Sequence, residues 1–299
     1  MKILLTGATG FVGRHLAQAL EAAGHQVTAA VRTPAKAQRL SPSLATVAID
    51  FNQALTPEHW ADAVAGQQAV VNAVGILRES SRQTFQNLHH RAPAALFSAA
   101  AAAGVQRIIQ VSALGADDHA QTAYQRTKKA ADDHLLSLGV PAAVLLPSVV
   151  FGPGSGSARM FTTMARLPII PLPGDGQQHV QPIHIHDLTD AVVELLEQTP
   201  MTTGRLPFVG PEALSLREFY DKLRRALGIA RPARFLPIPM PLIQLGANIG
   251  SHLPGVLLDR DTLAMLNQGS VGDASVVTAL LHRAPRPVEA FLSGPGAKP

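Results

Sequence analysis

The sequence contains no cysteine, which excludes disulfides, thiolate metal ligands and cysteine nucleophiles. Charged residues make up 15% and aromatic residues 4% of the 299 positions, and the net charge is +4. We therefore expect neither a charged interaction tail nor an aromatic surface for nucleic acid. No apolar run approaches the roughly 18 residues that a membrane span needs, and residues 1–5 do not form a signal peptide. These absences predict a soluble, cytoplasmic protein.

The chain opens on the stretch MKILLTGATGFVG, residues 1–13. A short apolar run is followed by Gly7, Gly10 and Gly13, and helical apolar spacing begins at Phe11. This pattern predicts a strand, a tight turn and a helix whose N-terminus holds the pyrophosphate of a dinucleotide. The turn residues that we expect to bind the cofactor are Gly7, Thr9, Gly10, Phe11, Val12 and Gly13. A glycine turn without a ligand is the weaker alternative.

Strands and helices alternate through the first half of the chain. Apolar segments predict strands over residues 1–5, 26–32, 46–50, 69–74, 107–112 and 142–146. Helical spacing occupies 11–23, 34–40, 57–64, 83–103 and 122–138. Because the strands are continuously apolar, we expect an α/β fold with a doubly wound parallel sheet of the Rossmann type, covered on both faces.

From Phe151 onward, glycine and proline become frequent. We expect residues 1–152, with 180–200 returning, to form the dinucleotide-binding domain. Residues 153–179 and 201–292 would form a smaller, mostly C-terminal substrate domain, with a flexible tail at 293–299. Within these segments we expect a strand and helix over 184–196 with Asp187 as N-cap, a strand at 206–210, a helix over 215–227, a proline-rich loop at 235–241, and helices near 242–249 and 261–266. The basic residues from Arg217 to Arg234 are interpreted as a solvated helix face.

Local charge favours NADP over NAD. The second strand ends at Arg32, with Lys36 a turn later, where an NAD site usually has an acid for the ribose 2′-hydroxyl. Asp50 and Phe51, at the end of the third strand, would bracket the adenine, although Asp50 could equally cap the next segment. The small residues after the fourth strand would let the ribose and nicotinamide approach backbone, unless they form an ordinary turn: Asn72, Ala73, Val74 and Gly75.

The candidate catalytic residues are Ser112, Tyr124 and Lys128. Tyr124 and Lys128 lie four apart on a predicted helix and share a face, so the ammonium is expected to lower the pKa of the phenol. Tyr124 could then act as general acid or base toward a carbonyl or alcohol, and Ser112 could hydrogen-bond the same oxygen.

Five motifs, taken together, resemble the extended and atypical short-chain dehydrogenase/reductases: TGATGFVG, NAVG, VSALGAD, YQRTK and LPSVVFGPG. VSALGAD, QPIHIHDL and VGPEALSLREF are most similar to the branch that contains accessory subunit 9 of the alpha subcomplex of respiratory complex I. The resemblance implies a Rossmann domain with a smaller substrate domain, bound NADP(H) or NAD(H), a Ser-Tyr-Lys triad, and Pro147 and Val149 beside the cofactor. Many extended members have Arg-Pro at Leu146-Pro147, which argues against sugar-nucleotide epimerase activity.

Two functions therefore remain open. One is an NADP-dependent oxidoreductase for a small, largely apolar carbonyl compound or alcohol. The other is a non-catalytic dinucleotide-binding subunit or assembly factor of a respiratory complex. The apolar candidates for the substrate pocket, which could also be core, are Ile76, Leu77, Leu114, Val149, Val150, Phe151, Met160 and Met164.

Several histidines are candidates for ligands or surface groups. His184 and His186 alternate on a predicted strand near His179 and Asp187, but the set is incomplete and no metal site is predicted. His89 and His90 are expected at the surface.

Overall fold

The computed structural model describes residues 1–244 and 260–293, which divide into two compact units. The first unit comprises Met1–Leu146 and Thr189–Leu206, and the second comprises Pro147–Leu188 and Pro207–Pro299. Each unit has its own core, and each is described separately below.

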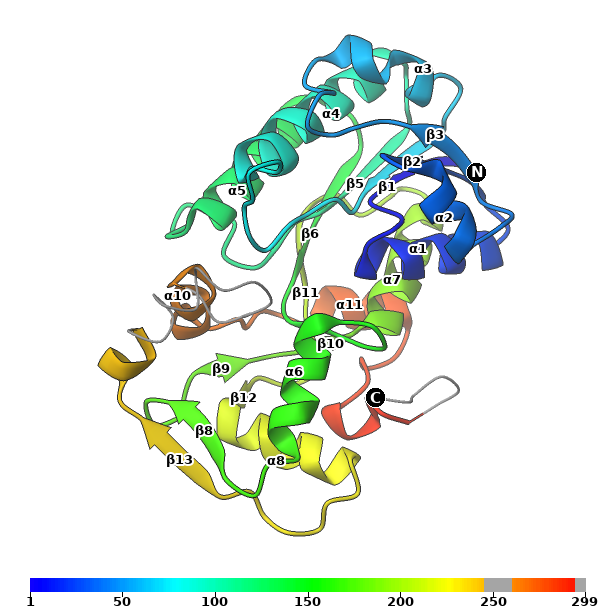
Figure 1. Cartoon of the computed structure of the whole chain (residues 1–299). Coiled ribbons are helices and arrows are strands. Elements are labelled where there is room, and N and C mark those ends of the chain that lie inside the picture. Colours follow the sequence, from blue (N-terminus) through cyan, green and yellow to red (C-terminus); the bar gives the residue numbers. More distant parts are fainter. Residues whose placement is uncertain (245–259, 294–299) are drawn as a thin grey trace. The chain divides into compact units, whose positions relative to one another are not determined.

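A seven-stranded sheet forms the centre of the first unit (Figure 1). Its strands are β1 (Lys2–Thr6), β2 (Gln26–Val31), β3 (Ala45–Ala48), β4 (Ala69–Asn72), β5 (Arg107–Val111), β6 (Ala142–Pro147) and β11 (Gly204–Phe208). The spatial order is β11-β6-β5-β4-β1-β2-β3, and the pairs among β1 to β6 are parallel. The order reverses between β1 and β4, which is where open α/β sheets bind ligands.

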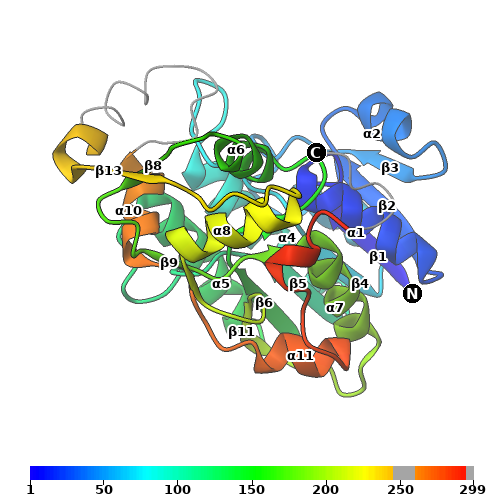
Figure 2. The ribbon, with the colours of Figure 1, turned by 90° about the horizontal axis from the view of Figure 1, so that it is seen from below.

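Helices cover both faces of this sheet (Figure 2). α1 (Phe11–Ala22), α2 (Pro34–Leu40) and α7 (Ile185–Glu197) lie on one face. The other face carries η1 (Pro57–Trp60), α3 (Ala61–Val64), η2 (Gln86–Arg91), α4 (Ala92–Ala102) and α5 (Ala123–Ser137). The predicted Rossmann-type fold is therefore confirmed.

The single helix expected over residues 83–103 is interrupted. Residues 86–91 form a π-helix, η2, and the regular helix α4 begins only at Ala92. Pro93, the second residue of α4, has no N–H to donate to the carbonyl of His89, so regular i→i−4 pairing cannot continue through this point.

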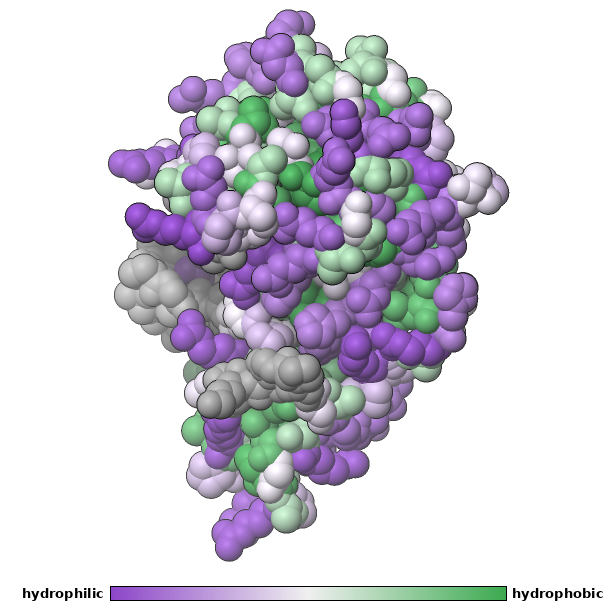
Figure 3. All heavy atoms as spheres, turned by 90° about the vertical axis from the view of Figure 1, so that its right-hand side faces the viewer, coloured by the Kyte–Doolittle hydropathy of each residue, from purple (hydrophilic) through white to green (hydrophobic). Residues whose placement is uncertain are grey.

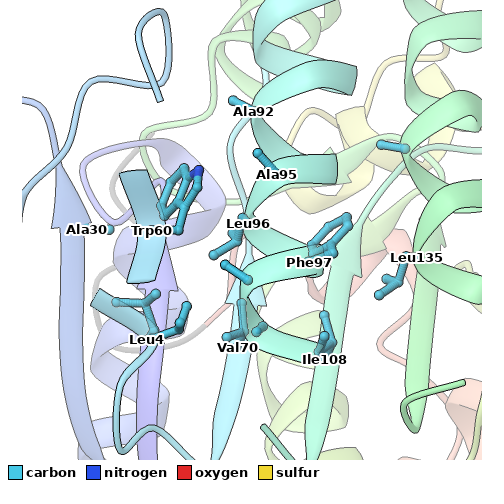
Figure 4. Close-up of a cluster of buried hydrophobic side chains, with 14 of the residues drawn as sticks. Leu4, Ala30, Trp60, Val70, Ala92, Ala95, Leu96, Phe97, Ile108 and Leu135 are labelled. Atoms are coloured by element: carbon cyan, nitrogen blue, oxygen red, sulfur yellow. The ribbon is translucent and has the colours of Figure 1, made fainter. Parts of the chain in front are cut away.

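The core between the sheet and the α4 side is a cluster of buried apolar side chains (Figure 4). Leu4, Val70 and Ile108 come from adjacent strands and are fully buried against Leu96 and Phe97 of α4. Trp60 is a further buried member of this cluster. Its indole N–H donates to the carbonyl of Ala54 at 2.9 Å, so its polar atom is satisfied inside the core.

The second unit is built from short elements. They are β7 (Val150–Phe151), α6 (Gly156–Ala165), β8 (Ile170–Pro173), β9 (His179–Val180), β10 (Ile183–His184), β12 (Leu214–Ser215), α8 (Leu216–Ala226), β13 (Phe235–Ile238), α10 (Arg260–Gln268), α11 (Ser275–Leu281) and η3 (Val288–Ala290). The strands pair two by two, as β10-β7, β12-β9 and β13-β8. Phe151, Phe219 and Leu223 lie in the core of this unit.

Several local expectations for the second unit were wrong. The proline-rich segment 235–241 contains β13. Its prolines stand at odd-numbered positions, whereas the backbone groups that pair with β8 belong to even-numbered residues, so the missing N–H groups do not interrupt the pairing. Asp187 is not an N-cap: it lies inside α7, and its carboxylate accepts hydrogen bonds from Arg283 and Arg286. His186 also lies in α7 and not on the expected strand, which ends at His184.

Two expected segments fall partly outside the described residues. Residues 240–244 are helical, but the rest of the helix expected near 242–249 is not described, and neither is the tail from 294. Among the described residues, no helix combines the length and apolar character that crossing a bilayer requires. On the face drawn in Figure 3, hydrophilic side chains predominate among the coloured residues, with apolar ones between them.

Candidate functional site

The turn between β1 and α1 can exist only with glycine at two positions. Gly7 has φ +74°, and a Cβ added there would lie 2.6 Å from the carbonyl oxygen of Ala73. A Cβ on Gly13 would lie 2.0 Å from the carbonyl oxygen of Gly7, so α1 can pack this close to the turn only without a side chain. Gly10, the N-cap residue of α1, supplies no side-chain cap, and the first turn of α1 has no acid. The helix N-terminus is thus left available to an anion.

Half of the predicted cofactor contacts line one hollow beside this turn. They are Gly7, Thr9, Gly10, Arg32, Asp50, Phe51, Ala73, Val74 and Gly75. An adjoining hollow of about 610 Å³ shares Arg32 and Asp50 with the first. Residues that the sequence reasoning missed are Asn52 and Gln83, which line both hollows, and Gln53, Ser80 and Arg82, which line the adjoining one. This volume is in the range of ordinary cofactor sites.

Other predicted contacts lie elsewhere. Phe11, Val12 and Gly13 form the first turn of α1, and Lys36 is exposed on α2. Pro147 and Val149 belong to the second unit. None of these six residues lines either hollow.

Asn72 is fully buried and shapes the turn that follows β4. Its side-chain oxygen accepts from the Thr6 hydroxyl at 2.5 Å and from the backbone N–H of Val74 at 3.3 Å. Its amide donates to the Gln110 side chain at 2.6 Å. Asn72 therefore links β1, β4 and β5 at the sheet edge that borders the hollow.

Lys128 is the most tightly held of the three catalytic candidates. Its buried ammonium donates to the carbonyls of Val111, at 2.9 Å, and Val74, at 3.2 Å. A Cβ built on Gly75, which lines the hollow, would lie 3.4 Å from the Lys128 nitrogen, so the ammonium lies at its border. Burial lowers the pKa of Lys128 to about 8, against the opposing effect of Asp132.

Ser112 is hydrogen-bonded to a carboxylate that the sequence reasoning missed. Its hydroxyl donates to Asp132 at 2.5 Å, and Asp132 is fully buried. Burial raises the pKa of Asp132 to about 6, although the Ser112 hydrogen bond and the Lys128 charge act in the opposite direction. Asp132 lies one helical turn after Lys128, a spacing that could have identified it as a member of the same face.

Tyr124 differs from expectation in its electrostatics. Its half-buried ring meets the rings of Phe85 and His89 edge-on, with centroids 5.9 and 5.1 Å away. Burial, and secondly the Asp132 charge, raise the pKa of Tyr124 to about 12. The expected lowering by Lys128 was wrong, because the ammonium is directed at backbone carbonyls.

His89 is buried, and the expectation that it lies at the surface was wrong. Its Nε2 accepts from the backbone N–H of Ile76 at 3.0 Å, so the neutral ring carries its proton on Nδ1, 3.4 Å from the Thr127 hydroxyl oxygen. Burial, and secondly the charge of Lys128, lower the pKa of His89 to about 2. The helical spacing of Phe85, His89 and Ala92 could have indicated this buried position.

The part of the chain that forms this site matches a known protein family. The family described as NAD(P)H-binding matches residues 7–154, which include the glycine turn, both hollows and the three catalytic candidates. The chain carries an NAD(P)H-binding domain over these residues. The resemblance in the motifs is thereby confirmed.

Curated relatives with this fold have different names. Subunit 9 of the NADH dehydrogenase [ubiquinone] 1 alpha subcomplex from Arabidopsis thaliana is 27% identical over 268 residues, 80% of this chain and 66% of that protein. The chain thus spans slightly less than two thirds of that relative. A ceramide reductase from Caulobacter vibrioides is 26% identical over 282 residues, covering 94% of this chain and 84% of the relative.

Solved structures agree on the fold. A nucleoside-diphosphate-sugar epimerase from Staphylococcus aureus matches with TM-score 0.78 and 19% identity over 98% of this chain and all of that chain. An NADPH-dependent quinone oxidoreductase from Escherichia coli, solved with NADPH, matches with TM-score 0.76 and 18% identity over 96% and 97% of the two chains.

Proposed function

We propose that the protein is a cytoplasmic NADP-dependent reductase of a small, largely apolar carbonyl compound. The observation that carries this proposal is the position of Lys128: a buried ammonium, fixed by two carbonyls at the border of the hollow and one helical turn from Tyr124. An ammonium so placed can hold the hydroxyls of a ribose. Bound NADPH would supply the hydride.

Tyr124 is suited to donate the proton. With a pKa of about 12, its phenol is protonated at neutral pH, so it can give a proton to the oxygen of a carbonyl that accepts a hydride. His89 holds the tyrosine ring in place from one side and cannot titrate at neutral pH, so we assign it a positioning role.

Ser112 would act through its oxygen. While Asp132 is ionised, the Ser112 proton is committed to that carboxylate, and only the lone pairs of the hydroxyl remain for a partner. Ser112 can therefore accept a hydrogen bond from the Tyr124 phenol or from a product alcohol. If Asp132 takes up a proton, the hydroxyl becomes free to donate to a carbonyl.

Two arginines support the preference for NADP. Arg32 and Arg82 both line the larger hollow and both are exposed. The acid in that hollow, Asp50, already accepts hydrogen bonds from the backbone and side-chain amides of Asn52. A 2′-phosphate would find two guanidinium groups there.

The NADP preference is tested by measuring affinity for NADPH and NADH. We expect Arg32→Ala and Arg82→Ala each to weaken NADPH binding by roughly 10 to 100 fold, the usual range for a lost charge-assisted hydrogen bond, with little effect on NADH. Arg39→Ala, an exposed arginine of α2 outside both hollows, is the matched control. Equal losses for both cofactors would exclude 2′-phosphate recognition.

Reductase activity is tested with NADPH and a panel of apolar aldehydes, ketones and quinones. We expect turnover in the native protein, and its loss in Tyr124→Phe with NADPH affinity unchanged. The matched control is Tyr220→Phe, which changes the other tyrosine of the chain, buried in the core of the second unit. Turnover that survives in Tyr124→Phe would rule out the phenol as the acid.

A second candidate is a non-catalytic dinucleotide-binding subunit or assembly factor of a respiratory complex. The engagement of the Ser112 proton by Asp132 favours it, because this leaves no serine donor for a carbonyl. The relatives named as NADH dehydrogenase subunits agree with this candidate. Tight NADPH binding without turnover of any carbonyl, together with co-purification of respiratory-chain subunits, would support it over the reductase.

A further inference from the structure

The second unit has an uncovered apolar surface bordered by arginines. Six large apolar side chains are exposed among the described residues, and four of these lie between positions 167 and 242: Leu167, Ile169, Leu236 and Leu242, at 39%, 50%, 51% and 60%. We define the basic-apolar surface as Leu167, Ile169 and Leu236 with the exposed Arg166, Arg231 and Arg234.

The β8-β13 sheet sets the face on which Leu236 lies. Pro171 pairs with Leu236 and Pro173 with Ile238, so these four side chains share one face. The opposite face carries Ile170 and Leu172, which are buried in the core of the unit. A small sheet that faces water normally carries polar residues on its outer side. Here, neither strand contains a polar residue on either side.

A buried arginine holds the two segments in register. Arg224 of α8, expected to be solvated, is 5% exposed and has no carboxylate partner among the described residues. It donates to the carbonyls of Ala165 and Leu167 at 2.6 and 3.1 Å, and to that of Arg231 at 3.0 Å. The loop that carries Arg166 and Leu167 is thereby fixed beside the loop that carries Arg231.

Basic residues predominate around this surface, and Asp221 lies at its edge, where its carboxylate accepts a hydrogen bond from the backbone N–H of Ala233 at 3.2 Å. Residues 152–174 and 222–258 contain arginines and one lysine but no Asp or Glu. Within the described residues, Arg166, Arg231 and Arg234 form no ion pair. Unpaired arginines beside exposed leucine and isoleucine match the composition of surfaces that insert shallowly into anionic bilayers.

The edge of this sheet is poorly suited to pairing with a strand of another protein. Ile170 donates to the carbonyl of Arg234 and Gly174 to that of Ile238, so the even-numbered residues of β13 face β8. The outward amides would then belong to residues 235, 237 and 239, and the last two are prolines without an N–H. An apolar, cationic surface whose outward edge keeps only the amide of residue 235 fits lipid better than a β-strand partner.

We propose that the basic-apolar surface docks the protein on an anionic lipid bilayer, where Leu167, Ile169 and Leu236 enter the headgroup region and the three arginines contact lipid phosphates. The docking is peripheral and requires no spanning segment. It extends the proposed function by naming where the protein works, and it does not depend on turnover.

Vesicle co-sedimentation with the full chain tests this proposal. We expect binding to vesicles of phosphatidylcholine mixed with phosphatidylserine, weaker binding at high salt, and little binding to phosphatidylcholine alone. Leu236→Asp and Arg234→Glu should each reduce the partition coefficient, the arginine change by roughly fivefold or more. Val271→Asp, at an apolar residue of the second unit that is 47% exposed outside this surface, and Arg39→Glu are the matched controls.

Each outcome decides the proposal. Unchanged NADPH affinity and thermal melting show that the variants are folded, and failure of the reductase assay leaves the vesicle result valid. No binding to anionic vesicles, or equal binding by the surface and control variants, overturns the proposal. A dimer in light scattering that Leu236→Asp converts to monomer, without vesicle binding, would instead assign the surface to a second copy of the chain.

Discussion

Buried polar side chains make different kinds of hydrogen bonds in the two units of the chain. In the first unit, buried polar side chains gather at the carboxyl edge of the sheet and hydrogen-bond to one another, as in the series Thr6, Asn72 and Gln110 and the pair Ser112 and Asp132. In the second unit, the buried charged side chains of Asp187 and Arg224 mainly hold segments outside regular helices and strands in place through hydrogen bonds. The difference suggests that the first unit is organised for chemistry and the second for holding a shape.

The largest expected effect comes from the glycine turn of the first unit. Gly13→Ala places a methyl group 2.0 Å from a backbone oxygen, so α1 must move. We expect a loss of about 3 kcal/mol in the free energy of unfolding and no measurable NADPH binding. Chemical denaturation and cofactor titration are the measurements.

Gly24→Ala provides the control for backbone strain. Gly24 has φ +81° and open space around its Cβ position, so we expect a cost of about 1 kcal/mol and normal NADPH affinity. If both variants bind NADPH equally well, close packing at Gly13 does not shape the site.

The second prediction concerns pH and compares two buried groups of the first unit. The pKa of Asp132 is raised to about 6, so acidification from pH 6 to 4 adds stability to the folded state. The pKa of His89 is lowered to about 2, so acidification below pH 6.5 removes stability. The two contributions oppose each other in the native protein.

Asp132→Asn should remove the contribution of Asp132 and leave the opposing contribution of His89. Between pH 6 and 4, we expect the variant to lose about 2 kcal/mol more of its free energy of unfolding than the native protein does. Urea denaturation at several pH values measures this, and Asp62→Asn, at an exposed carboxylate of α3, is the control. Parallel pH curves for the native protein and Asp132→Asn would contradict the assigned burial of the charge.

The third prediction concerns the buried carboxylate of the second unit. Asp187→Asn removes the charge that faces Arg283 and Arg286 at 2.7 and 2.6 Å. Because both arginines are partly exposed and can be solvated, we expect a loss of about 2 kcal/mol, less than for a fully buried pair. Denaturation with NADPH affinity measured in parallel should show destabilisation; an unchanged melting curve would mean that this cluster does not hold the second unit together.

The smallest effects compare matched helix caps. Thr122 begins α5 and Ser215 begins α8, and each forms a capping box, with Gln125 and Glu218 respectively. We expect Thr122→Ala and Ser215→Ala each to cost about 1 kcal/mol. Only Thr122→Ala should alter turnover, since α5 carries Tyr124 and Lys128. Equal kinetic effects of the two changes would contradict the assignment of the chemistry to the first unit.

The regular part of the fold was predictable because its signals are local. Continuously apolar strands and the glycine turn predict β1, α1 and the parallel sheet, and α2 spans Pro34–Leu40 as its proline start indicates. The second unit was less predictable, because strands of two to four residues, such as β8, carry too few positions to show alternation. Proline in β13 suggested a loop, although its bonding pattern tolerates proline on the outward side.

Side chains that act through tertiary contacts were the hardest to anticipate. Asp132 has a spacing signal on α5, but only the fold shows that Ser112 donates to it. His89 is a polar residue that packs in the core as a neutral ring, because the π-helix η2 turns it toward Ile76. Arg82 joins Arg32 only through the folding of the segment that follows β4.

The central claim is that the uncapped N-terminus of α1 and the hollow beside it hold one NADP(H) per chain. Isothermal titration of the purified protein with NADPH and NADH tests it most directly. We predict stoichiometric NADPH binding that is tighter than NADH binding and is abolished by Gly13→Ala. Absence of binding heat for both nucleotides with the folded native protein, or unchanged affinity in Gly13→Ala, would contradict it.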